Sequence, residues 1–230
     1  MNEQLPTENI LFTPLKTTVD VIQDTILQRI CFLEYSPGDQ LKEAVIAKEF
    51  GVSRTPVRDA LSRISHLGLI ETKNGVGTVV VKMSDEKIAH LYEVRLELAA
   101  LIGKLSPATI DDNHRIEATA IHEAALELQE NFDPREFVRL NQRMQVLISS
   151  LIGNPVLQDF WHQSYFQAAS IWQRMAVLFG DKVASALVRE TEDLKTALEQ
   201  NNIDAVGYLQ RLHISYGYNL IRENMFGKEF

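Results

Sequence analysis

The chain has 230 residues, of which 45% are hydrophobic and 23% are charged, and its formal net charge is −8. This length suits two domains, and the mixed composition predicts packed cores and excludes a largely disordered chain. The sequence has no apolar run near the ~18 residues of a membrane span, no secretory signal at its N-terminus and only one cysteine, Cys31, so we expect a cytoplasmic protein without an internal disulfide.

The first residues, 1–15, show no hydrophobic periodicity and contain Pro6 and Pro14, so we expect an N-terminal arm. Helical spacing of apolar residues begins after the arm and predicts a helix over 17–33. This helix opens a domain that we assign to residues 16–83.

The segment 41–61 predicts two short helices joined by a tight turn. Apolar residues recur at helical spacing and stop at Gly51, the residue type expected just past a helix end. Ser53 is suited to cap the second helix, whose apolar positions Val57 and Leu61 face inward. The pattern is that of a helix-turn-helix.

The start of the second helix carries two arginines. Arg54 and Arg58 are four residues apart, so they share one face, and this face points away from the apolar stripe. A recognition helix presents such side chains to base edges and phosphates. Pro56 lies in the first turn, where its missing N–H costs little, and Arg63 adds positive charge. The alternative is an ordinary solvated helix face.

A hairpin follows this helix. Residues 69–72 and 78–81 are rich in β-branched and apolar residues and flank Asn74-Gly75, a strong hairpin signal. Helix-turn-helix plus hairpin is a winged helix, and Gly75 and Gly77 allow the wing backbone to approach a phosphate or a minor groove.

The negative charge of the chain is unevenly distributed. Residues 1–83 carry 9 Lys+Arg against 10 Asp+Glu, whereas residues 84–230 carry 14 against 21. Within 51–73 the basic residues outnumber the acidic ones, so the predicted DNA face is locally basic, and its binding should weaken with salt.

At these residues the chain resembles the GntR family of bacterial transcription regulators. The match runs from about 18 to 81 and is most specific over 51–61, Gly-Val-Ser-Arg-Thr-Pro-Val-Arg-Asp-Ala-Leu. The resemblance implies a homodimer that binds a palindromic double-stranded DNA operator, with repression as the default mode. Together with the residues above, it gives the predicted DNA-binding set Ser53, Arg54, Thr55, Pro56, Arg58, Arg63, Gly75 and Gly77.

The rest of the chain, 84–230, is helical in pattern without strand-like alternation. Helices are predicted near 85–103, 107–130, 134–152, 155–179, 181–200 and 203–225. The fold class is therefore mainly α, a winged helix-turn-helix domain followed by an all-helical bundle of about six helices.

This half resembles the FCD domain, the ligand-sensing domain of the FadR subfamily. The resemblance is carried by Tyr92-Glu93-Val94-Arg95, by Gly153-Asn154-Pro155-Val156-Leu157, and by residues 197–214. It implies a domain that binds a small-molecule effector and forms the dimer.

Many members of this group hold a metal with an Asp, a His four residues later and two further His residues. The corresponding positions here are Asn141, Gln145, Thr191 and His213. Only His213 is a usual ligand of zinc or nickel, so we expect no metal or other cofactor but a polar pocket. Weak metal binding through His213 and waters stays open, as does a purely structural role for this histidine.

A carboxylic acid is the expected effector, and its charge calls for a cation. Arg95 is the preferred partner because it lies within an apolar helical pattern, with Arg139 and Arg143 as alternatives. Asn141, Gln145, Thr191 and His213 would add hydrogen bonds. The competing interpretation is that Arg95 forms an ion pair with Glu97 or Glu123.

Two other classes of function were weighed. An enzyme is disfavoured because the six histidines are scattered and the sequence has neither a nucleophile motif nor a Gly-rich phosphate loop. A DNA-binding regulator whose helical half only dimerises and senses no ligand remains the alternative. The sequence therefore predicts a ligand-responsive DNA-binding transcriptional regulator.

Overall fold

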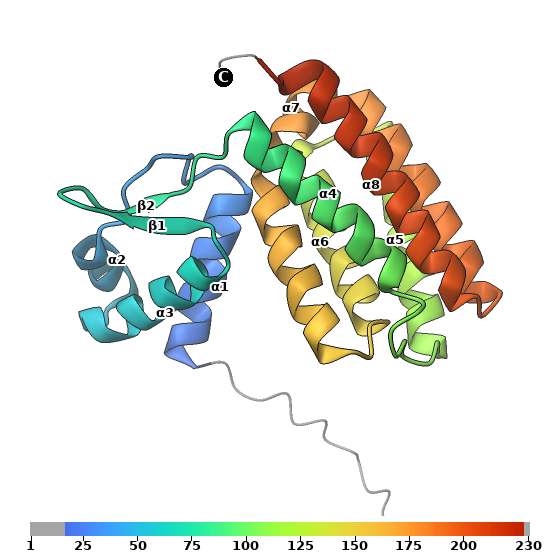
Figure 1. The fold of residues 1–230 in the computed structure, drawn as a ribbon, viewed down its shortest axis with the longest axis horizontal. Coiled ribbons are helices and arrows are strands. Elements are labelled where there is room, and N and C mark those ends of the chain that lie inside the picture. Colours follow the sequence, from blue (N-terminus) through green and yellow to red (C-terminus); the bar gives the residue numbers. More distant parts are fainter. Residues whose placement is uncertain (1–16, 228–230) are drawn as a thin grey trace, which may run out of the picture.

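The computed structural model describes residues 17–227, and the N-terminal arm predicted for 1–15 lies outside this range. The described chain forms two packed domains (Figure 1). The first contains α1 (Thr18–Cys31), α2 (Glu43–Phe50), α3 (Arg54–His66), β1 (Ile70–Lys73) and β2 (Gly77–Val80). The second contains α4 (Asp85–Leu101), α5 (Asp112–Glu130), α6 (Pro134–Ser150), α7 (Pro155–Glu199) and α8 (Ile203–Met225).

The first domain is the predicted winged helix-turn-helix. Helix α2 ends at Gly51, which has a left-handed φ of 65°, and Ser53 is the N-cap of α3, although its side chain makes no capping hydrogen bond. Strands β1 and β2 pair antiparallel, with Ile70 opposite Val80. The residues before α2 run beside β2, where the backbone N–H of Leu41 donates to the carbonyl of Thr78. This segment therefore supports the hairpin along strand β2.

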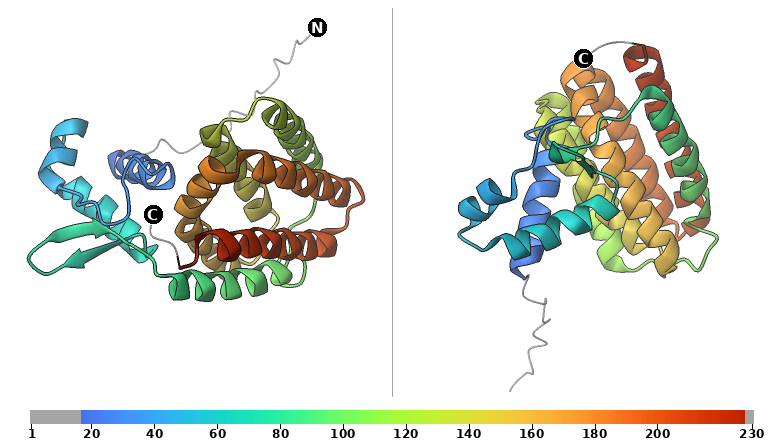
Figure 2. Two further views of the ribbon diagram at one scale, coloured as in Figure 1. Left: turned by 90° about the horizontal axis from the view of Figure 1, so that it is seen from above. Right: turned by 60° about the vertical axis from the view of Figure 1, so that its left-hand side comes forward.

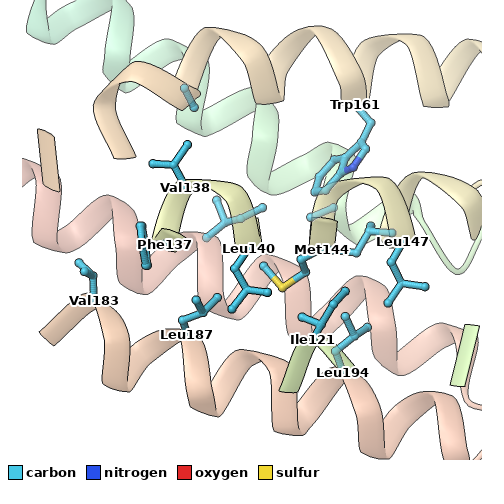
Figure 3. Packing of buried hydrophobic residues seen from close by; sticks show 14 of the residues in the cluster. Ile121, Phe137, Val138, Leu140, Met144, Leu147, Trp161, Val183, Leu187 and Leu194 are labelled. Carbon is cyan, nitrogen blue, oxygen red and sulfur yellow. The ribbon is translucent and has the colours of Figure 1, made fainter. Parts of the chain in front are cut away.

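The second domain is the predicted all-helical bundle, and α7 packs against each of its other helices. Met144 and Leu140 of α6 point into the core toward Ile121 of α5 and Leu187 of α7 (Figure 3). These side chains are at most 5% exposed, which is typical of a close-packed interior.

Two predicted helix boundaries differ from the structure. Helix α5 begins at Asp112, not near residue 107, because Asp111 caps it and the backbone N–H of Ala108 instead bonds to the carbonyl of Leu151. The break expected at residues 180–181 is a kink within one long helix, at Phe179 (φ −136°, ψ 33°). Gly180 leaves space for the ring of Phe132, which would lie 2.8 Å from an added Cβ.

The two domains meet along the first half of α7 (Figure 2). Phe166 of α7 packs against the core of the winged domain, and Phe32, which follows α1, packs against the core of the bundle. An ion pair between Arg135 and Glu34 (2.6 Å) adds to this interface. The winged domain is therefore held on the bundle by residues of both domains.

Candidate functional site

The exposed N-terminal turn of α3 presents the predicted recognition residues. Arg54 and Thr55 are exposed, and Arg54 makes no ion pair with another described residue. Arg58 is also accessible, with a side chain 63% exposed, and its Nε donates to Oε2 of Glu43 at 2.8 Å. Arg58, which forms an ion pair, and Arg54, which does not, lie one turn apart on the same side of the helix.

Arg63, a predicted DNA-binding residue, is not brought to this surface. It lies nine residues after Arg54, about half a turn around the helix, because each residue of an α-helix advances by about 100°. Its Nη1 donates to Asp20 of α1 at 2.8 Å. The structure therefore ties Arg63 to the body of the winged domain.

The two glycines of the wing adopt the positive φ angles that the turn of the hairpin requires. Gly75 has φ 75° and Gly77 has φ 103°, which are conformations that residues with a side chain rarely adopt. Gln40 lies behind the tip, where its side chain donates to the carbonyl of Val76. A Cβ at Gly77 would lie 3.1 Å from this amide, so glycine also makes room for the support.

The bundle encloses a cavity of about 570 Å³, lined by residues of α4, α6, α7 and α8. This size is typical of small-molecule sites. Four of the five predicted effector residues line it, namely Arg95, Asn141, Gln145 and His213. Its other walls are largely apolar or aromatic, with Phe137, Met144, Ile148, Trp161, Tyr165, Trp172, Leu187, Ile214 and Leu220 among them.

Arg95 is a buried cation without a carboxylate partner. Its side chain is 4% exposed, and Nη1 donates to the backbone carbonyl of Ser164 at 2.9 Å. The guanidinium carbon lies 5.6 Å from the ring of Tyr92 and 5.8 Å from the ring of Trp161. Burial lowers the pKa of Arg95 below its usual range, because the charged form loses hydration.

None of the carboxylates in the described chain forms an ion pair with Arg95. The predicted rival partner Glu97 pairs with Arg211 at 3.1 Å. The alternative cations are occupied as well, since Arg139 pairs with Glu136 and Arg143 pairs with Glu117. Arg95 is thus a buried cation of the cavity lining, whereas Lys182 and Arg189, which also line the cavity, are exposed.

Three nitrogen donors of the cavity lining are buried without a hydrogen-bond partner. They are Nε of Arg95, Nε2 of Gln145 and Nε1 of Trp161. Leaving a buried donor unpaired costs about 1–3 kcal/mol, and more when the group is charged. Each of these nitrogens belongs to a residue that lines the cavity.

The residues at the positions that match the metal set of the FCD group are engaged in other contacts. Thr191 does not line the cavity, because its hydroxyl donates to the carbonyl of Val188 and lies 3.1 Å from Nδ1 of His122. Nε2 of His213 lies 2.9 Å from Oδ2 of Asp193. The amide of Asn141 donates to the carbonyl of Phe137, and Gln145 offers only a neutral amide. The described residues contain no cluster of three or more His, Cys, Asp or Glu suited to a metal.

Sequence reasoning missed an acid in the cavity, Glu190. Gln210 donates to its Oε1 at 3.2 Å, and burial raises the pKa of Glu190. The charge of His213 partly opposes this shift. Glu190 precedes the predicted Thr191 by one residue, and the sequence pattern of α7 did not resolve which of the two faces inward.

Comparisons with known proteins agree with this architecture. The model of the bacterial regulatory proteins of the gntR family matches residues 18–80, and that of the FCD domain matches residues 90–216. None of the described helices is long and apolar enough to cross a membrane.

Individual relatives are regulators. The uncharacterized HTH-type transcriptional regulator YdhC of Bacillus subtilis is 24% identical over 74% of this chain and 76% of its own. The gluconate operon transcriptional repressor of Bacillus subtilis is 42% identical over 28% of this chain and 26% of its own. Among solved structures, Escherichia coli McbR/YncC has the same fold, with a TM-score of 0.75, 15% identity, and coverage of 91% of this chain and 99% of its own.

The unpaired amide in the cavity leads to a stability prediction. Replacing Gln145→Met keeps the shape but removes the unpartnered Nε2, so the free energy of unfolding should rise by about 1 kcal/mol in urea denaturation. The control is Gln129→Met, because Nε2 of Gln129 already donates to Ser185 at 2.9 Å and its loss brings no gain. A loss of stability in the Gln145 variant would contradict the assignment of an unsatisfied donor.

Proposed function

Because the chain belongs to the GntR family of bacterial regulatory proteins and carries an FCD domain, we propose that this DNA-binding transcriptional regulator is a ligand-responsive repressor. It binds a palindromic operator as a homodimer and responds to a small organic acid in its helical domain. The observation that carries the effector assignment is the set of unpaired N–H donors around one cavity. The similarity to the gluconate operon repressor supports repression.

Operator recognition uses the N-terminal turn of α3. Arg54 and Thr55 reach base edges or phosphates in the major groove, and Arg58 exchanges Glu43 for a phosphate. The wing follows the adjacent backbone or minor groove, where Gly77 permits a close approach. The exposed positions of these residues support this assignment.

Homodimer formation uses the face shared by α4 and α7. Val94, Val156 and Phe160 are 55%, 62% and 56% exposed, an unusual exposure for large apolar side chains that lie near one another. Val94 and Phe160 also line a groove of about 420 Å³ beside the winged domain. A second copy that covers this face removes the apolar surface from water and sets the distance between the two recognition helices.

The organic acid binds with its carboxylate on Arg95. The guanidinium has a free Nε and no competing carboxylate, and Gln145 and Trp161 add neutral donors beside it. A charge-assisted hydrogen bond in a buried site is stronger than one between neutral groups. The acid thereby supplies acceptors to donors that have no hydrogen-bond partner within the described chain.

The effector signal passes through one turn of α7. Ser164 accepts the hydrogen bond from Arg95, and its neighbours Gln163 and Gln167 donate to the backbone carbonyls of His66 (3.1 Å) and Leu67 (2.8 Å). These carbonyls lie at the C-terminal end of the recognition helix α3. When the acid draws Arg95 away from Ser164, the turn shifts and the two recognition helices change their spacing.

The DNA contact is tested with two arginine variants. Arg54→Ala should weaken binding to the DNA upstream of the gene that encodes this chain by about ten- to a hundredfold. It should also lower the slope of log affinity against log salt concentration by about one. Arg63→Ala should change affinity less than about twofold, because this residue lies on the other side of the helix and its exposed ion pair contributes little. Fluorescence anisotropy at several salt concentrations measures both. Equal losses for the two variants would refute the assignment of this surface.

The dimer face is tested by introducing charge. Phe160→Glu should convert the dimer to a monomer, because a carboxylate cannot be buried at the centre of an apolar interface without a partner. The matched control is Val146→Glu on α6, at a side chain that is 71% exposed away from this face. Size-exclusion chromatography with light scattering gives the mass of each. A wild-type monomer, or a dimer that survives Phe160→Glu, would rule out this interface.

The effector response is tested by thermal shift with a panel of small organic acids, followed by DNA binding. An acid that raises Tm should change operator affinity by about 5–150-fold, the usual range of allosteric coupling. The double variant Gln163→Ala, Gln167→Ala should still bind the acid but lose most of this response. Gln158→Ala is the control, because its amide bonds to Ser149 within the bundle.

Two outcomes would decide against this scheme. If none of the acids stabilises the protein, the helical domain only dimerises. If the double variant responds to the acid like wild type, the signal does not pass through these two glutamines.

A further inference from the structure

The cavity is lined by two ionisable residues of opposite type that are not paired with each other, Arg95 and Glu190; the other charged residues of its lining, Asp181, Lys182 and Arg189, are exposed. We propose that its ligand is a zwitterion, an amino acid with an apolar side chain, whose carboxylate binds Arg95 and whose ammonium group binds Glu190. This inference rests on the proposed effector site and names the class of acid that the site selects.

The geometry of the two charges supports a bridging ligand. Both residues line the same cavity, yet they form no ion pair within the described chain. They remain close enough for each to affect the ionisation of the other. A small molecule that carries both charges, placed between them, gives each one the partner that it lacks.

Glu190 has a neutral hydrogen-bond partner but no cationic one. Gln210 donates to Oε1 at 3.2 Å, and the nearby imidazole of His213 is engaged with Asp193. Burial favours the neutral form of this carboxyl group, and an incoming cation stabilises its ionised form more than another neutral donor does. A simple monocarboxylic acid would satisfy Arg95 but leave this carboxylate as it is.

The remaining walls suit the rest of such a ligand. Aromatic rings of Trp172 and Tyr165 line the cavity, and rings of this kind attract ammonium groups. Apolar side chains, including Met144, Ile148 and Leu187, provide a surface for a hydrocarbon side chain. Acidic, basic and apolar groups therefore converge on one site, as recognition of an apolar amino acid requires.

The test compares compounds that differ by one charged group. Isothermal titration calorimetry of the full chain uses leucine, its deaminated analogue 4-methylpentanoate and its decarboxylated analogue 3-methylbutylamine, together with the matching series from phenylalanine. At least one amino acid should bind about ten- to a hundredfold more tightly than both of its analogues, because each analogue lacks one charge-assisted contact.

A charge-removing variant assigns the ammonium contact. Glu190→Gln should weaken binding of the amino acid by about tenfold or more and leave the deaminated acid unchanged or tighter, which abolishes the preference. Glu192→Gln is the control, since Glu192 lies on the same helix but is exposed. Retention of the preference in the Glu190 variant would overturn the proposal.

The outcomes also separate this inference from the proposed function. If the deaminated acids bind as tightly as the amino acids and still change DNA affinity, the acid-responsive regulator stands and the zwitterion is wrong. If none of the compounds in either series binds, the zwitterion proposal is overturned, and the panel of other organic acids decides the proposed function independently.

Discussion

The hydrogen bond from Arg95 to the backbone carbonyl of Ser164 is the contact on which the rest of the arrangement depends. It joins α4 to α7 beside Gln163 and Gln167, which donate to backbone carbonyls of the winged domain. A guanidinium buried this deeply loses hydration, and a peptide carbonyl with two aromatic faces compensates only part of that loss. In the scheme that we propose, an anion that binds this guanidinium acts on the group that joins the two helices.

Local signals in the sequence were sufficient for most of the fold. A left-handed glycine after α2, an N-cap before α3 and a glycine-containing turn between β-branched segments are determined by backbone preferences within a few residues, so the winged helix-turn-helix was predictable. The continuity of α7 across residue 180 was not predictable from the sequence. Gly180 resembles a helix stop in the sequence, but its small size serves to accommodate the ring of Phe132, and this contact depends on packing between distant segments.

The candidate site residues also divide into those that local sequence predicts and those whose placement depends on packing between helices. Arg54 and Arg58 were placed correctly on one exposed face, because their separation is about one helical turn. The ion pair of Arg63 with Asp20 depends on where α1 packs, and the sequence of α3 alone does not reveal that position. In the cavity, a helical repeat predicted that Arg95 points inward. The rotation of α7 was beyond this reasoning, because a helix buried on several sides has no single apolar stripe; Thr191 therefore faces His122, and Glu190 lines the cavity in its place.

The faces of helix α7 are divided among the three roles that we propose for it, namely dimerisation, effector binding and contact with α3. Val156, Phe160, Gln163 and Gln167 follow one another at intervals of three or four residues and form one stripe, which combines the proposed dimer face with the contact to α3. Trp161 and Tyr165 lie about 150° further around the helix, toward the cavity, and Ser164 lies between the two sets. A rotation or shift of this single turn alters all three contacts together. Packed helices have discrete arrangements and do not deform continuously. In the scheme that we propose, a ligand in the cavity would therefore select between defined positions of the recognition helices.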